Sequence, residues 1–380
     1  MTISLTSSNS TTMLKTRRRF LQLSGIAFST ALLSSCRGRF ADVQSGSGSN
    51  ASSPSGNQAT LRIYTWSNYF DDELLSNFKA STGIQVIADV FDSNETMLAK
   101  MQAGGGSQYS IVYPSDYMVQ QMIDLKLLQE LDQAKLKGLD NLLLNFKNPV
   151  YDPNNRHSVP AVWGTTGLVY NSSQLIPPPQ DWDYLWQNKS RLSRRVTLFN
   201  DVREVMGATL KSLGYSYNST DPKQLEAAYK KLQTLKSAIA NFTTDGWRDQ
   251  LLTGDLSIAM GYSSDAIQIM AENSDIQCVI PASGSSLWTD TMSIPQTAPN
   301  IEAAYSWINF LLEPASLAKT VERLKFATAN QAAIDLLPTS LKTDPNLYPS
   351  KSVLDNCERI APVCKTTDLF DRYWTQLTSL

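Results

Sequence analysis

The chain has 380 residues, of which 42% are hydrophobic and 18% are charged, and its formal net charge is −2. This length suits two domains with well-buried cores, and the composition is ordinary for a globular protein. The near-neutral charge gives no reason to expect nucleic acid as a partner. The single histidine, His157, excludes mechanisms and metal sites that need two imidazoles.

The N-terminus carries the features of an export signal. Residues 16–21, Thr-Arg-Arg-Arg-Phe-Leu, fit the twin-arginine pattern, and the weakly apolar stretch that follows is too short to span a bilayer. Residues 33–36, Leu-Ser-Ser-Cys, look like a bacterial lipobox, in which the cysteine is acylated and begins the mature chain. We predict a signal peptide over 1–35, a lipid anchor at Cys36, a flexible linker over 36–59 and a periplasmic location. An ordinary signal peptide with an incidental cysteine is the alternative.

Loss of the signal peptide changes the charge balance. Residues 1–35 hold four basic residues and no acid, so the mature chain has 29 basic against 35 acidic residues, a formal charge of −6. An exported protein of this charge is a better partner for cations than for anions. Cys357 and Cys364 are close enough in sequence to pair in an oxidising compartment, but two reduced thiols are an equal alternative.

Strands and helices alternate from Leu61 onward, which predicts a mostly parallel sheet. In the first part of the chain we expect strands at 61–66, 84–91 and 111–113, and helices at 71–80, 93–101 and 116–124. The run Gly104–Gly106 lacks the Lys-Ser/Thr of a phosphate-binding loop, so it indicates the end of a helix.

A second alternating unit follows. A segment begins at 158–164, and strands are expected at 168–170, 196–199, 256–260 and 276–280. A helix should begin at Asp221-Pro222, with the cap and the proline in their usual places. Its expected apolar face is formed by Leu225, Tyr229, Leu232, Leu235 and Ile239.

The junction at residues 198–207 reads as a strand, a turn and the start of a helix, and it carries Asp201 and Glu204. In an open α/β sheet, ligands bind in the crevice beyond such strand ends. From these residues alone, a helix cap explains the pair equally well, with Glu204 reaching back to the backbone N–H of Asp201.

Seven stretches, taken in order, resemble motifs of the spermidine/putrescine-binding proteins of ABC polyamine importers. They are residues 64–69, 92–97, 112–117, 159–164, 201–205, 288–290 and 305–312. The resemblance covers nearly all of residues 60–380. It implies a two-lobed α/β fold of the periplasmic-binding-protein type II, each lobe a mixed, mostly parallel sheet flanked by helices, with the ligand cleft between them. The expected lobes are 60–162 with 290–332, and 166–286 with 337–380.

A polyamine site needs carboxylates to compensate the ammonium groups and aromatic faces to cover the methylenes. The resemblance assigns the aromatic box to Trp66, Tyr69, Tyr117, Tyr262 and Trp288. It assigns the carboxylates to Asp201, Glu204 and Asp290, and further hydrogen bonds to Ser67, Ser115 and Thr244. The positive helix end is expected to keep Asp201 and Glu204 ionised. Five further tryptophans are expected to pack in the core: Trp182, Trp186, Trp247, Trp307 and Trp374.

This sequence departs from the pattern of many spermidine binders at three positions, Asn68, Tyr262 and Phe326. Asn68 stands where many spermidine binders have an acid, and Tyr262 stands where a tryptophan is usual. Asp265 matches a carboxylate of putrescine-preferring relatives and is expected to replace the charge missing at Asn68, although a helix cap explains it nearly as well. Phe326 replaces a common tyrosine. These changes leave open which polyamine is preferred.

The resemblance implies a monomeric receptor that delivers a polyamine to a membrane permease and its ATPase, with no cofactor, no metal and no chemistry of its own. A sensory amine receptor is an alternative. A second alternative is an enzyme on a related fold that uses a cysteine nucleophile, as some thiamine-degrading enzymes do. Cys278 falls within an expected strand without a nearby base, which disfavours that role.

Overall fold

The computed structural model describes residues 60–363 and 366–379. The expected signal peptide, the anchor Cys36, the linker and Cys364 lie outside the described residues. Within the part that is described, none of the helices combines the length and the apolar character needed to cross a bilayer.

The strands belong to a mixed sheet with helices around it. The strands are β1 Thr60–Thr65, β2 Gln85–Val90, β3 Ile111–Val112, β4 Ser158–Asn171, β5 Val196–Leu198, β6 Ile239–Phe242, β7 Ile258–Tyr262, β8 Ile276–Val279, β9 Leu287–Ser293 and β10 Ala327–Thr328. The helices of the first two thirds of the chain are α1 Asp72–Thr82, α2 Asn94–Gln102, α3 Asp116–Asp124, α4 Tyr184–Gln187, α5 Val202–Ser212, α6 Pro222–Leu235 and α7 Trp247–Thr253. The remaining helices are α8 Ser263–Glu272, α9 Ile301–Leu312, α10 Pro314–Leu324, α11 Gln331–Leu336, α12 Thr339–Lys342, α13 Lys351–Leu354 and α14 Thr367–Thr378.

The strand order is β2-β1-β3-β9-β4-β7-β5-β6, and β10 and β8 also pair with β4. Strand β1 is parallel to β2 and β3, and β5 is parallel to β6 and β7. Every pair that includes β4 or β9 is antiparallel. The alternation of strands and helices therefore produced parallel pairs toward both ends of the strand order, and the antiparallel strands β4 and β9 join them into a mixed sheet.

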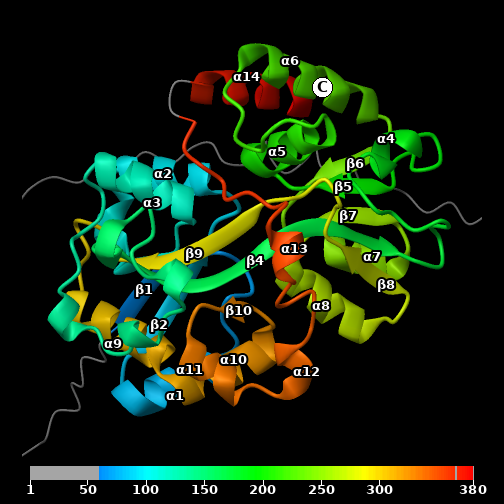
Figure 1. Ribbon diagram of the computed structural model, residues 1–380. Helices are drawn as coiled ribbons and strands as arrows, with labels where there is room; N and C mark the ends of the chain where they lie inside the picture. The colour runs from blue at the N-terminus through cyan, green and yellow to red at the C-terminus, as the bar shows by residue number, and fades with distance from the viewer. Residues whose placement is uncertain (1–59, 364–365, 380) are drawn as a thin grey trace, which may run out of the picture. The chain divides into compact units, whose positions relative to one another are not determined.

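Strand β4 links the two parts of the sheet (Figure 1). Residues 158–165 pair with β9, and residues 166–171 pair with β7 and β8. We call β1, β2, β3, β9, β10 and the first half of β4 the first lobe, and β5 to β8 with the second half of β4 the second lobe. The expected lobe boundaries remain predictions.

The separation of residues 158–164 from a strand at 168–170 was wrong, because the run forms one strand of 14 residues. Pro160 lies within it, at a register irregularity between Pro160 and Val162 in the pairing with β9. A proline removes one ladder hydrogen bond, and an irregularity of this kind is where a sheet tolerates the loss.

Several local signals have the expected effect on helix ends. Asp71 caps α1 by accepting a 2.7 Å hydrogen bond from the Leu74 backbone N–H, and Gly83 ends that helix in the left-handed conformation at φ 73°. Asp221 caps α6, whose first residue is Pro222. Ile239 was wrongly placed on this helix. It begins β6, because the helix ends at Leu235 and the i+4 spacing continues past that end by coincidence.

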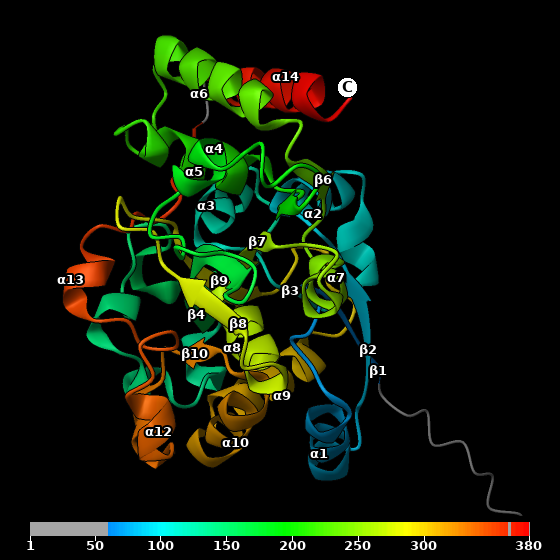
Figure 2. The same ribbon diagram turned by 90° about the vertical axis from the view of Figure 1, so that its right-hand side faces the viewer.

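The C-terminal helix α14 lies along α6 in both views of the ribbon (Figures 1 and 2). The rings of Tyr229 and Tyr373 stack there with their centroids 4.6 Å apart. This contact packs the end of the chain against the helices of the second lobe.

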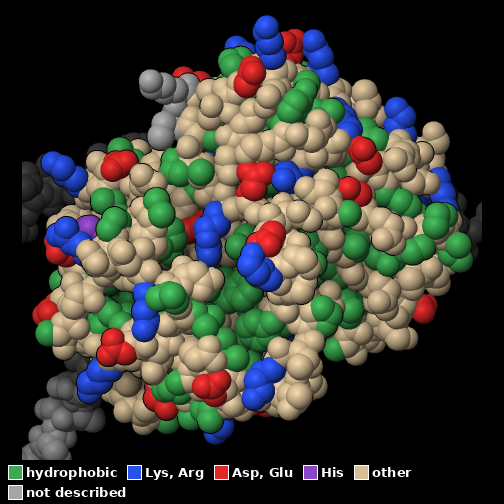
Figure 3. Space-filling model, in the orientation of Figure 1, with side chains coloured by type: hydrophobic (Ala, Val, Ile, Leu, Met, Phe, Trp, Pro, Cys, Tyr) green, Lys and Arg blue, Asp and Glu red, His purple; other side chains and the backbone are tan. Residues whose placement is uncertain are grey.

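The tryptophans expected in the core are buried to different degrees. Trp182, Trp247 and Trp307 are 0–1% exposed. Trp186 and Trp374 are partly buried and pack against the main hydrophobic core. On the face shown in Figure 3, acidic and basic side chains are interspersed, and hydrophobic side chains gather near its middle.

Candidate functional site

A cavity lies where residues that follow β1, β5 and β7 meet residues of β9. It contains about 640 Å³ outside protein atoms, part of it open to solvent. Its lining includes every sequence-predicted ligand residue except Asn68, namely Trp66, Ser67, Tyr69, Ser115, Tyr117, Asp201, Glu204, Tyr262, Asp265, Trp288 and Asp290. Thr244 and Phe326 line it as well.

Asp201 caps helix α5 from within this cavity. One of its oxygens accepts hydrogen bonds from the backbone N–H groups of Arg203 and Glu204, at 2.8 and 3.1 Å. The residue is 4% exposed and lines the cavity at the same time. Helix capping and contact with the cavity are therefore compatible, because a carboxylate has two oxygens.

Glu204 does not complete the expected capping box. Its carboxylate accepts hydrogen bonds from three hydroxyl groups instead of turning back to the Asp201 N–H. The donors are Tyr217 at 2.7 Å, Ser286 at 2.9 Å and Thr166 at 3.2 Å. All three donors are neutral, and Glu204 is 2% exposed. The capping interpretation is thus correct for Asp201 and wrong for Glu204.

Asp290 lies in β9 and is held by two further hydroxyl groups. The Ser115 hydroxyl donates to it at 2.5 Å, and the Tyr69 hydroxyl donates to its other oxygen. Asn94 fixes Ser115 in turn, by a 2.9 Å hydrogen bond from its amide to the Ser115 hydroxyl. Asp290 therefore faces the cavity in a fixed orientation.

Burial raises the pKa values of these acids. The pKa of Glu204 rises to about 8 because the group is desolvated and Asp201 repels its charge. The pKa of Asp290 rises to about 7, mainly through desolvation. Desolvation also raises the pKa of Asp201, although its two backbone hydrogen bonds act in the opposite direction. The expectation that the helix end keeps Glu204 ionised was wrong, because burial outweighs the helix dipole there. For Asp201 it stays a prediction, since burial and the two backbone hydrogen bonds act on its pKa in opposite directions.

Aromatic rings form much of the remaining wall. The Tyr262 ring lies 4.3 Å from Phe199 and 5.3 Å from Trp288, measured between centroids. On the first lobe, Trp66 packs edge-on against Phe91 at 4.5 Å, and its indole N–H donates to the Tyr113 carbonyl at 3.0 Å. These contacts fix the rings, so they form a preorganised apolar part of the cavity wall.

Tyr117 is tied to a charged group behind the cavity wall. Its hydroxyl donates to Glu95 at 3.1 Å, and the Arg203 guanidinium lies over its ring at 5.5 Å. Glu95 is almost fully desolvated, which raises its pKa to about 7. Tyr117 lines the cavity while its hydroxyl donates to Glu95.

Asp265 has a different environment from the other acids. It accepts a 2.6 Å hydrogen bond from the guanidinium of Arg248. Arg248 is the second residue of α7. The amide oxygen of Asn68, in the orientation that satisfies both groups, accepts two hydrogen bonds of 2.7 Å from the same guanidinium. That Asp265 replaces the charge missing at Asn68 stays a prediction, and in the structure Arg248 forms hydrogen bonds with both residues.

Sequence reasoning missed some residues that shape the cavity. The additional lining residues are Phe91, Asn94, Asp116, Asp245, Ser264 and Ile360. Asp245 follows the end of β6, so the strand-end rule could have found it. Asp116 forms a 3.0 Å ion pair with Arg359, a residue 243 positions later for which the sequence contains no signal.

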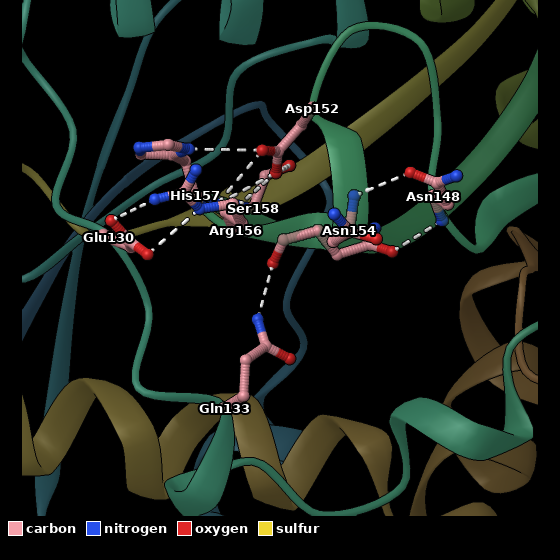
Figure 4. Close-up of polar contacts among 9 residues, drawn as sticks. Glu130, Gln133, Asn148, Asp152, Asn154, Arg156, His157 and Ser158 are labelled. Atoms are coloured by element: carbon pink, nitrogen blue, oxygen red, sulfur yellow. Dashed lines mark hydrogen bonds and ion pairs between the residues drawn. The ribbon is translucent and has the colours of Figure 1, made fainter.

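The single histidine lies in a polar group apart from the cavity (Figure 4). His157 Nδ1 is 3.2 Å from one oxygen of Asp152, and the Ser158 hydroxyl donates to the other oxygen at 2.7 Å. Ser158 is fully buried. In a Ser-His-Asp triad the serine must contact the imidazole, whereas here it contacts the carboxylate. This group therefore fixes the turn into β4.

Neither a reactive cysteine nor a metal site is evident among the described residues. Cys278 lies in β8, where burial raises the pKa of its thiol to about 12, and it does not line the cavity. Among the described residues, no cluster of His, Cys, Asp and Glu has an arrangement that could hold a metal ion.

A mixed sheet flanked by helices, with a cavity lined by polar and aromatic side chains, has the fold of the periplasmic binding proteins. The family model described as bacterial extracellular solute-binding protein matches residues 73–349. The chain belongs to this family.

Named relatives are similar over most of the chain. The spermidine/putrescine-binding periplasmic protein of Salmonella typhimurium is 34% identical over 319 residues, which cover 84% of this chain and 91% of that protein. A solved structure, a putative spermidine/putrescine ABC transporter from Listeria monocytogenes, is 35% identical with a TM-score of 0.79 and covers 84% and 98% of the two chains. The spermidine/putrescine ABC transporter substrate-binding protein PotD of Streptococcus pneumoniae is 38% identical with a TM-score of 0.71, covering 84% and 99%.

Proposed function

We propose that this chain is the substrate-binding component of an ABC importer and that its ligand is a polyamine, spermidine or putrescine. The observation that carries the proposal is the pairing of buried acids and aromatic rings in one cavity. Glu204 and Asp290 accept hydrogen bonds from hydroxyl groups, and neither has an ion-pair partner among the described residues. Buried carboxylates without a cation are costly, and a ligand ammonium would offset that cost.

The aromatic rings suit the rest of such a ligand. Trp66, Tyr262 and Trp288 line the cavity, and contacts with neighbouring rings hold them in place. A methylene chain gains from apolar burial there, and each cationic centre over a ring contributes about 0.5–2 kcal/mol. The names of the relatives at 34–38% identity favour the same ligand class.

In this proposal the receptor binds its ligand without changing it chemically. The monomeric receptor closes its lobes around the amine and passes it to a permease and ATPase complex in the membrane. It reaches the periplasm by the twin-arginine route and is held to a membrane through Cys36. If so, the Cys36→Ala variant is released from membranes, and unchanged fractionation would count against the anchor.

Calorimetric titration of purified protein with a ligand panel tests the binding proposal. The panel contains putrescine, cadaverine, spermidine, spermine, a sugar and an anion. We expect heat from diamines or triamines, and binding weaker by about 1 kcal/mol or more in Asp290→Asn. Asp355→Asn is the matched control, since Asp355 pairs with Lys351 on an exposed helix. Binding of the sugar or the anion with no amine signal would refute the proposal.

A further inference from the structure

Arg248 is the only arginine or lysine that the structure places in contact with both Asn68 and Asp265, two of the predicted ligand residues. Its guanidinium donates to Asp265 at 2.6 Å and is 2.7 Å from the Asn68 amide oxygen. A second acid of the cavity wall, Asp245, lies 3.9 Å from it. The arginine side chain is 20% exposed and that of Asp265 is 7% exposed, so this pair is shielded from solvent.

The charge at this end of the cavity differs from the charge in the rest of it. Arg248 is the foremost charge acting on Asp265, and Asp245 is the other. Asp290, in contrast, is repelled by Asp116 and Asp201, and Glu204 is repelled by Asp201. One end of the cavity is thus neutralised by Arg248, and Asp116 is paired with Arg359, whereas Glu204 and Asp290 have no ion-pair partner among the described residues.

A guanidinium resembles a ligand ammonium in the properties that matter for Asp265. It is a cation that donates hydrogen bonds, and it keeps its charge at any working pH. A ligand ammonium that approached Asp265 would also approach Arg248, whose nearest nitrogen is 2.6 Å from the carboxylate. Two cations that share one carboxylate in a shielded site repel each other strongly.

We propose that Arg248 is a built-in cation that takes the place of a ligand ammonium at Asp265, and so decides how many ammonium groups a polyamine can place in the cavity. The proposal rests on the proposed function and adds a specificity-determining residue to it. Asp265 then pairs with Arg248 and not with the ligand. The ligand's ammonium groups pair only with Asp201, Glu204 and Asp290.

The Arg248→Gln variant tests this role. Glutamine keeps a polar side chain in the first turn of α7 but removes the charge, which leaves Asp265 for a third ammonium. We expect the ratio of the putrescine Kd to the spermidine Kd to rise roughly tenfold, the scale of one charge-assisted hydrogen bond. The Arg248→Lys variant retains the charge and should keep the wild-type ratio. Arg156→Gln removes an equal charge from an exposed pair with Glu130 and should also keep it.

The Arg248→Gln/Asp265→Asn double variant distinguishes an effect of the Asp265 charge from an effect of the volume that the Arg248 side chain fills. If the charge of Asp265 binds the third ammonium, the double variant should return to within about threefold of the wild-type ratio. A ratio that stays high in the double variant would mean that Arg248 only fills space, and would overturn the proposal.

A ratio that does not move in Arg248→Gln would also overturn it. If both affinities fall by the same factor, Arg248 is only a contact between the lobes through Asn68. These outcomes are distinct from failure of the proposed function, in which the wild-type protein binds neither amine. Circular dichroism of each variant verifies that the protein is folded.

Discussion

The ring of Trp288 lies against Gly164, its partner across β4 and β9. A Cβ atom at Gly164 would lie 2.5 Å from the Trp288 ring and 2.6 Å from the Ser263 hydroxyl. Real Cβ atoms essentially never approach other atoms so closely, so only glycine leaves room for the tryptophan in this place. The pairing of these two residues sets the position of one wall of the cavity.

The Gly164→Ala variant should therefore displace Trp288 and weaken amine binding by about tenfold, measured by calorimetry. Gly246→Ala is the control, since its added methyl group would meet only Thr243 at an ordinary 3.4 Å. We expect that control to bind within about twofold of the wild type. Wild-type affinity in Gly164→Ala would contradict the prediction, because it would show that the cavity binds the amine equally well with Trp288 displaced.

Amine binding should strengthen as the pH rises from 6 to 8.5. Burial raises the pKa values of Glu204 to about 8 and Asp290 to about 7, so both acids are partly protonated near neutral pH. An ammonium ligand needs the ionised form, which means that binding must release protons. We expect an affinity gain of roughly tenfold over this range. Titrations in two buffers with different ionisation enthalpies measure the released protons directly, and identical heats in both buffers would contradict the prediction.

The stability of the ligand-free protein should change with pH in the opposite direction. The pKa of Glu204 is raised in the folded state from the ordinary 4.5 to about 8, so the folded state binds the extra proton. The stabilisation is complete below pH 4.5 and is lost as the pH rises through 8. The wild-type Tm should fall between pH 6 and pH 8.5, and Glu204→Gln should fall less. We expect a difference on the order of 2–5 °C by calorimetry. If the Tm falls equally in the two proteins, a group other than Glu204 is responsible for the pH dependence.

Local rules predicted the parts of the site that depend on neighbouring residues. Asp201 follows the end of β5 and begins α5, so its capping role and its place in the cavity both follow from the strand-to-helix pattern. The family resemblance added residues such as Asp290 and Trp288, whose positions in a strand gave no sign of a ligand site.

The hydrogen-bond partners of the buried acids come from distant parts of the chain, so they could not be predicted from the sequence. The three hydroxyl donors to Glu204 come from positions 13, 38 and 82 residues away, and nothing in their local sequence marks them as partners of an acid. Arg248 and Asp265 meet because α7 and α8 begin close together in the fold. The raised pKa values depend on the burial that all these contacts produce together.

Contacts between the lobes outside the cavity should affect affinity without affecting selectivity. The Asn200 amide donates to the Asp92 carboxylate at 3.1 Å, and the Thr244 hydroxyl donates to the Asp92 carbonyl at 3.3 Å. Neither Asn200 nor Asp92 lines the cavity. Loss of the amide in Asn200→Ala removes one hydrogen bond between the lobes, which is worth about 0.5–1.5 kcal/mol.

We therefore expect Asn200→Ala to weaken putrescine and spermidine binding by the same factor, roughly two- to tenfold, mainly through faster dissociation. Stopped-flow measurement of both amines gives the two rates. Asn188→Ala is the control, because that amide donates to Tyr184 in the same helical turn. A uniform loss here, beside a changed ratio in Arg248→Gln, would separate lobe closure from ligand choice. A changed ratio in Asn200→Ala would instead mean that Asp92, once freed from Asn200, acts on the ligand itself.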